Sequence, residues 1–87
     1  MYVIVVYDIG EKRVNKMLKL CRRYLHWIQN SVFEGDISEV RLKEFLDLAK
    51  TIMKTEYDSL IIFKSRNEKW LNRQIIGQER NTLDNML

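Results

Sequence analysis

The sequence predicts a single α+β domain in which two amphipathic helices alternate with short strands. Two runs, residues 2–7 and 60–63, contain only apolar residues rich in β-branched and aromatic types, which is typical of strands buried on both faces. Two longer stretches, residues 12–24 and 38–54, repeat apolar residues every three or four positions, as amphipathic helices do. With 87 residues, no proline and no repeat, we expect one domain over residues 1–77, followed by a polar tail at 78–87.

The first strand ends at a candidate functional residue, Asp8, and Gly10 then permits a turn into the first helix. This helix has two distinct faces. Its apolar stripe comprises Val14, Met17, Leu18, Cys21, Tyr24 and Leu25. Its opposite side, which we call the positive face, comprises Lys12, Lys16, Lys19 and Arg23, with Arg13 and Arg22 beside it.

The middle of the chain is strand-like in composition, but its alternation fails. Trp27 and Phe33 fall on one face, whereas Ile28 and Val32 fall on the other, so we predict two short strands around a bulge or reversal at residues 30–31. Ser38 is a candidate N-cap for the second helix. After the apolar strand at residues 60–63, we expect a last short strand within residues 70–77.

The element order is therefore βαββαβ with an extra C-terminal strand, which is the ferredoxin-like arrangement. In this arrangement both helices lie on one face of an antiparallel sheet. Because two strands are apolar on both faces and only two helices are available, the other face needs a cover. The simplest cover is a second copy, so we expect a two-fold homodimer that packs sheet to sheet.

Composition limits the class of protein. Apolar residues make up 46% of the chain, which excludes a disordered protein, and a net charge of +3 permits a nucleic-acid partner. The lone cysteine cannot form an intramolecular disulfide and fits a reducing compartment. No apolar run approaches the roughly 20 residues of a membrane span, and no signal peptide is evident, so we expect a cytoplasmic protein without a membrane partner.

Three features together resemble the second core CRISPR-associated protein family, the small partner of the CRISPR adaptation integrase. They are the apolar strand that ends in Tyr7-Asp8-Ile9, the basic helix after it, and the segment Gln29-Asn30-Ser31-Val32-Phe33-Glu34-Gly35. The resemblance covers the chain to about residue 77. It implies a ferredoxin-like homodimer that in many members is a metal-dependent endonuclease on RNA or DNA, with a role in acquiring spacers from invading DNA.

The resemblance also implies roles for individual residues. The family's metal-binding aspartate matches Asp8, contributed by both subunits near the two-fold axis. The strand aromatic matches Phe33, and the serine before it matches Ser31. The chain departs from many relatives at Trp27, where they have an arginine, and after Arg13, where they often have a second arginine.

Mg²⁺ takes oxygen ligands and usually needs only one or two protein carboxylates. An Asp8 pair in a dimer would supply them, and the metal would polarise a phosphate and activate water. From the residues alone, capping of the first helix by Asp8 is the favoured alternative, and the resemblance reverses that preference.

The other candidates also have alternatives. Ser31 could contact phosphate or only tolerate the bulge, and Phe33 could stack on a base or belong to the core. The positive face could be a solvated surface or, doubled by a two-fold axis, a track for nucleic-acid phosphates. His26 more often packs than catalyses, so we leave it out of the site, and Cys21 belongs to the core.

Three functions remain. The first is a Mg²⁺-dependent endonuclease that uses an Asp8 pair on RNA or duplex DNA. The second is a non-catalytic nucleic-acid-binding scaffold of the CRISPR adaptation complex, which holds integrase subunits at a fixed spacing. The third is a ferredoxin-like RNA-binding or regulatory module, which the lack of an aromatic-rich RNP1-type octamer disfavours.

Overall fold

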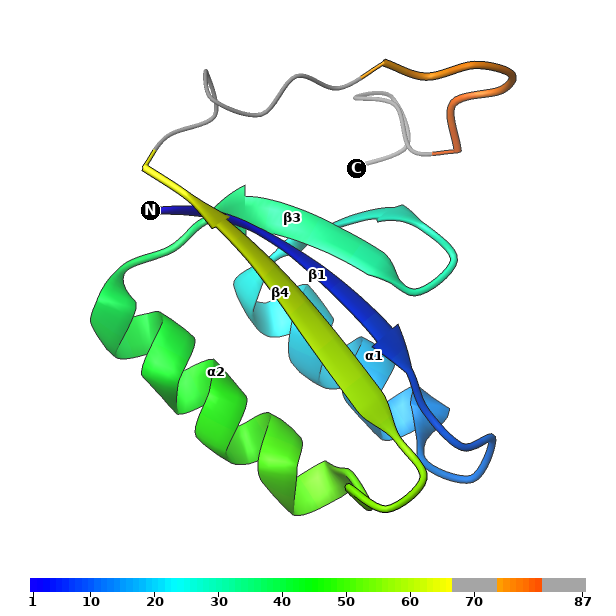
Figure 1. The fold of residues 1–87 in the computed structure, drawn as a ribbon, viewed down its shortest axis with the longest axis vertical. Helices are drawn as coiled ribbons and strands as arrows, with labels where there is room; N and C mark the ends of the chain where they lie inside the picture. The colour runs from blue at the N-terminus through cyan, green and yellow to red at the C-terminus, as the bar shows by residue number, and fades with distance from the viewer. Residues whose placement is uncertain (67–73, 81–87) are drawn as a thin grey trace.

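The computed structural model describes residues 1–66 and 74–80, in which a four-stranded antiparallel sheet is covered on one face by two helices (Figure 1). The strand order across the sheet is β2-β3-β1-β4. The described elements, in chain order, are β1 (Tyr2–Asp8), α1 (Val14–Tyr24), β2 (His26–Gln29), β3 (Val32–Asp36), α2 (Glu39–Ile52) and β4 (Ser59–Ser65). The predicted α+β, ferredoxin-like order βαββαβ is confirmed.

The central strand β1 is apolar on both faces, but its two faces are not equivalent. Val3, Val5 and Tyr7 are buried in the core beneath the helices, whereas Ile4 and Val6 on the other face are only partly buried. This alternation follows from the two-residue repeat of a strand. The side that carries Val5 is therefore the helix-covered face of the sheet.

Each helix contributes one stripe to the core. In α2 the buried residues are Leu42, Phe45 and Ala49, and the Ser38 hydroxyl caps the helix by accepting a hydrogen bond from the Arg41 amide at 3.2 Å. In α1 the buried residues are Met17, Leu20 and Cys21. The sequence stripe omitted Leu20, which the structure buries where the two helices meet.

The β2–β3 hairpin explains the failed alternation in the sequence. Trp27 pairs with Phe33, but Gln29 pairs with Val32, so one residue of β2 is extra and forms a bulge. Asn30 has a φ of 44°, a left-handed conformation that asparagine tolerates. Both the two-strand interpretation and the shared face of Trp27 and Phe33 are confirmed.

The predicted C-terminal strand falls partly outside the described residues. Residues 70–73 are not described, and residues 74–77 are described but are not in a strand. The extra strand is therefore not observed in this part of the chain. The domain boundary at residue 77 stays a prediction, and most of the proposed tail lies outside the description.

The face of the sheet that carries no helix presents an apolar strip, which we call the open face. In the register, Val6 pairs with Val32 and Ile61, so these side chains share this face. Ile4 and Phe63 extend the strip by a second row. Ile61 and Phe63 are 52% and 53% exposed, so the described residues of a single chain leave the open face uncovered. No helix in the described ranges is both long and apolar enough to span a bilayer.

A buried carboxylate joins the two loops at one end of the sheet. Within the described residues, Asp58 accepts four hydrogen bonds: from the Gly10 amide at 2.8 Å, Arg13 Nε at 2.7 Å, Arg13 Nη2 at 2.8 Å and the Lys54 amide at 2.9 Å. Its side chain is completely buried. We call Asp58 with Gly10, Arg13 and Lys54 the Asp58 clamp. It fastens the β1–α1 connection to the α2–β4 connection.

The clamp keeps Asp58 ionised. The hydrogen bonds from the Arg13 guanidinium, with smaller contributions from the Lys54 and Gly10 amides, hold the pKa of Asp58 well below its ordinary value of 3.8, although burial opposes this shift. A carboxylate whose pKa is lower in the folded chain than in the unfolded chain stabilises the fold above the unfolded pKa.

We therefore expect the Asp58 contribution to be fully present at neutral pH and to be lost as the pH falls below 3.8 toward the depressed folded pKa. The measurement is the free energy of unfolding by denaturant between about pH 6 and about pH 3. Wild type should lose more stability than Asp58→Asn over this range, because the variant lacks the titrating group. If the free energy of unfolding fell equally with pH in wild type and Asp58→Asn, the clamp would not depend on the charge of Asp58.

Candidate functional site

Asp8 is the last residue of β1 and lies on the same side of the sheet as the open face. Its neighbour Tyr7 is buried beneath the helices, so alternation directs Asp8 away from them. Its partner across the ladder is Ser59 of β4. Asp8 is exposed, and its carboxylate has no hydrogen bond or ion pair with the described residues.

The helix-cap alternative for Asp8 is wrong. The N-cap of α1 is Arg13, five residues further along the chain, and α1 has no side-chain cap. The turn before α1 is instead closed by the Arg13 amide, which donates to the Gly10 carbonyl at 2.8 Å. Asp8 therefore does not cap α1, and among the described residues its carboxylate is not engaged, as a catalytic or metal-binding role requires.

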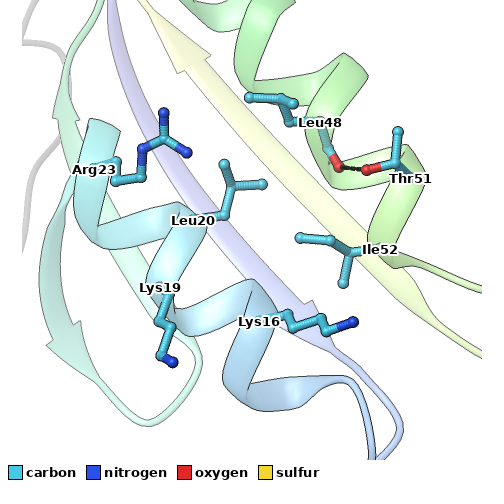
Figure 2. A pocket seen from close by; sticks show the side chains of 7 residues that line it. All are labelled: Lys16, Lys19, Leu20, Arg23, Leu48, Thr51 and Ile52. Carbon is cyan, nitrogen blue, oxygen red and sulfur yellow. Dashed lines mark hydrogen bonds between the residues drawn. The ribbon is translucent and has the colours of Figure 1, made fainter.

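The positive face is exposed along α1 as predicted. Figure 2 shows Lys16, Lys19 and Arg23 on α1 beside an open groove of about 280 Å³ between the two helices. Its floor and far wall are formed by Leu20 of α1 and by Leu48, Thr51 and Ile52 of α2. Lys12 is also exposed, just before the helix. The structure thus gathers Lys16, Lys19 and Arg23 on one outer surface.

The cations and Asp8 lie on opposite sides of a single chain. Lys16, Lys19 and Arg23 of the positive face lie on the outer surface of the helix layer (Figure 2). Alternation along β1 places Asp8 on the uncovered side of the sheet. One copy therefore does not bring Lys16, Lys19 and Arg23 into one site with the predicted catalytic residue.

The structure assigns other positions to two predicted contact residues, Arg13 and Phe33, whereas contact of Ser31 with phosphate stays a prediction. Arg13 donates two hydrogen bonds to Asp58 and its side chain is only 21% exposed, so its observed role is in the clamp. Phe33 is 0% exposed and its ring lies 6.2 Å from that of Tyr7, at an interplanar angle of 20°. Phe33 is a core residue, and its assignment to a base-stacking surface is corrected. Ser31 is partly exposed in the β2–β3 turn, where its carbonyl accepts the Tyr7 amide at 3.1 Å.

Of the two residues left out of the predicted site, Cys21 lies in the core as predicted, whereas His26 is exposed and not packed. His26 is exposed, and it pairs with Glu34, which in turn pairs with Ile4 of β1. Its row across the sheet is therefore four residues along β1 from Asp8. Cys21 is fully buried, and burial raises the pKa of its thiol to about 12, which makes it an inert core residue.

The residue that the sequence did not single out is Asp58. It follows a polar loop, and nothing local in the sequence indicates that its carboxylate is buried. Its partner Arg13 is 45 residues away. The pairing is visible only once the two loops are seen at the same end of the sheet.

The metal-binding capacity of a single chain is limited. Among the described residues, no group of three or more histidine, cysteine, aspartate or glutamate side chains could hold a metal ion. Asp8 has the right chemistry for a hard cation, because its carboxylate is ionisable, exposed and free of described partners. It fits one ligand of a magnesium site that a second carboxylate would have to complete.

Comparison with known proteins identifies the family. The family model described as CRISPR associated protein Cas2 matches residues 1–73. A protein of Fusobacterium nucleatum named CRISPR-associated endoribonuclease Cas2 is 45% identical over 92 residues, covering 100% of this chain and 87% of its own length. A protein of Dictyoglomus turgidum with the same name is 44% identical over the full length of both chains.

Solved structures agree with these sequence matches. A structure described as "Crystal structure of cas2" is 40% identical, with a TM-score of 0.87 over 95% of this chain and 93% of that one. The Streptococcus pyogenes Cas2 structure at pH 6.5 is 25% identical, with a TM-score of 0.79 over 88% of this chain and all of that one. Family model, curated relatives and solved structures coincide, and the chain belongs to the Cas2 family of CRISPR-associated proteins.

Proposed function

We propose that this chain is a Mg²⁺-dependent endonuclease of CRISPR adaptation, which cleaves phosphodiester bonds of RNA or duplex DNA as a two-fold homodimer. The observation that carries the proposal is Asp8, a free carboxylate on an uncovered apolar side of the sheet. The names of the relatives, CRISPR-associated endoribonuclease, support the reaction class.

The dimer is argued from the open face. Half-exposed Ile61 and Phe63 continue a strip of apolar side chains that a monomer would leave in water. A second copy covers this strip with an identical strip, as two-fold interfaces do. The same symmetry places a second Asp8 on the same interface, which a single chain lacks.

Asp8 from each copy would hold the divalent metal, and the metal would supply a polarised phosphate oxygen and a water of lowered pKa. The cations of the positive face bind backbone phosphates without regard to sequence. The integrase of CRISPR adaptation is the protein partner that we propose. A cytoplasmic location fits a chain whose one cysteine is buried as a free thiol.

A non-catalytic scaffold is the second candidate function. One observation favours it: the positive face lies on the helix layer, away from Asp8. Phosphate binding can therefore work without cleavage. In this case the dimer would present a positive face on each copy and hold nucleic acid and integrase subunits at a fixed spacing.

The dimer proposal predicts opposite results for two neighbouring substitutions. Wild type should show twice the chain mass by light scattering at micromolar concentration. Val6→Lys places an ammonium on the open face and should give a folded monomer. Val5→Lys buries an unpaired charge in the core and should cost several kcal/mol, so that this variant unfolds. A wild-type monomer, or a dimeric Val6→Lys, would contradict the interface.

The catalytic proposal predicts that Asp8→Asn lowers Mg²⁺-dependent cleavage of RNA or duplex DNA by orders of magnitude, while nucleic-acid binding survives. In metal-free buffer, the variant should melt no lower than wild type, because the substitution removes repulsion between two carboxylates. The control is Asp47→Asn, an exposed carboxylate on α2 that should change neither result. Wild-type cleavage by pure Asp8→Asn would leave the scaffold as the function.

The phosphate-binding proposal concerns the positive face. Lys16→Ala combined with Lys19→Ala should weaken binding equally for all duplex sequences. The slope of log affinity against log salt concentration should become shallower by about 1 for each phosphate that the variant no longer neutralises. Lys43→Ala combined with Lys50→Ala removes two exposed lysines from α2 and serves as the matched control. An unchanged slope in the first variant would show that the positive face is only solvated.

A further inference from the structure

We infer that the Asp58 clamp is the positioning element of the Asp8 site, with Asp58 and Arg13 acting through the backbone on either side of Asp8. This inference rests on the proposed function, because it assigns Asp8 a ligand to hold. It gives Arg13 a role that differs from direct contact with nucleic acid.

The clamp holds Asp8 from two directions. Along the chain, Asp8 is two residues from Gly10, whose amide donates to Asp58 Oδ1, and the intervening Ile9 is buried. Across the ladder, Asp8 pairs with Ser59, which directly follows Asp58. A displacement of Asp58 would therefore move both the strand partner of Asp8 and the turn that follows it.

The clamp is closed on the α2 side as well. Lys54, in the connection that follows α2, donates its amide to Asp58 Oδ2, and its carbonyl accepts the Asp58 amide at 2.8 Å. The Arg13 guanidinium contacts both carboxylate oxygens, which fixes the orientation of the plane of the carboxylate. The connections that follow β1 and α2 thus both hold Asp58. Asp8, by contrast, has no described side-chain partner, so its position depends on its backbone.

Gly10 shows how closely the clamp is packed. A Cβ at this position would lie 2.4 Å from Arg13 Nη2 and 3.0 Å from Arg13 Cζ. With alanine at position 10, the guanidinium would have to shift from its observed position on Asp58. Gly10→Ala therefore loosens the clamp without removing any charged group and without touching Asp8.

The test is the affinity of the homodimer for Mn²⁺, which prefers the same oxygen ligands as Mg²⁺ and can be followed by electron paramagnetic resonance. Gly10→Ala and Asp58→Asn are compared with Asp8→Asn and with the surface control Asp47→Asn. Melting temperature and light scattering establish that each variant is folded and dimeric under the conditions of the titration. We expect Gly10→Ala and Asp58→Asn to bind Mn²⁺ about 10-fold more weakly or worse, as loss of a supporting shell does, and Asp47→Asn to bind as wild type.

The outcomes separate this inference from the proposed function. Wild-type affinity in folded, dimeric Gly10→Ala, with affinity lost in Asp8→Asn, would overturn the clamp as a positioning element and leave the metal site in place. Equal affinity of wild type and Asp8→Asn would overturn the metal site and, with it, this inference. If Asp58→Asn does not fold, the result for Gly10→Ala decides, because that variant keeps every hydrogen-bonding group of the clamp.

Discussion

A four-stranded sheet has two faces, and the described chain supplies helices for only one of them. Val5 and Phe33 are completely buried beneath α1 and α2, while Ile61 and Phe63 on the open face are half exposed. Removal of such surface from water is the main favourable contribution to folding and association. In the dimer that we propose, a second copy covers this face, and Asp8 would then lie at the subunit interface.

Two aspartates at the same end of the sheet have opposite environments. Asp58 is buried and saturated with hydrogen bonds, most strongly from Arg13, which lowers its pKa and fixes it as a structural charge. Asp8 is exposed and has no described partner, so it keeps its ligand capacity. One carboxylate therefore shapes the loops, and the other stays exposed at the end of β1. The positive charge of Arg13 is paired with Asp58.

Local patterns in the sequence predict what local physics determines. The six element types, the cap at Ser38, the core position of Cys21 and the shared face of Trp27 and Phe33 follow from spacing and alternation, and they are confirmed. The features that the sequence does not predict depend on tertiary contacts. The pairing of Asp58 with the distant Arg13 and the complete burial of Phe33 depend on how loops and strands meet, which no periodicity encodes.

The dimer that we propose brings the two copies of Asp8 together across the open face. It is tested most directly by a spin label at Asp8→Cys in a Cys21→Ala background, with Lys50→Cys on the outer surface of α2 as control. We expect dipolar broadening of the spectrum from the label at position 8, and this broadening should disappear on dilution with unlabelled chain. The label at position 50 should show no broadening. An unbroadened spectrum from a labelled homodimer at position 8 would contradict the claim.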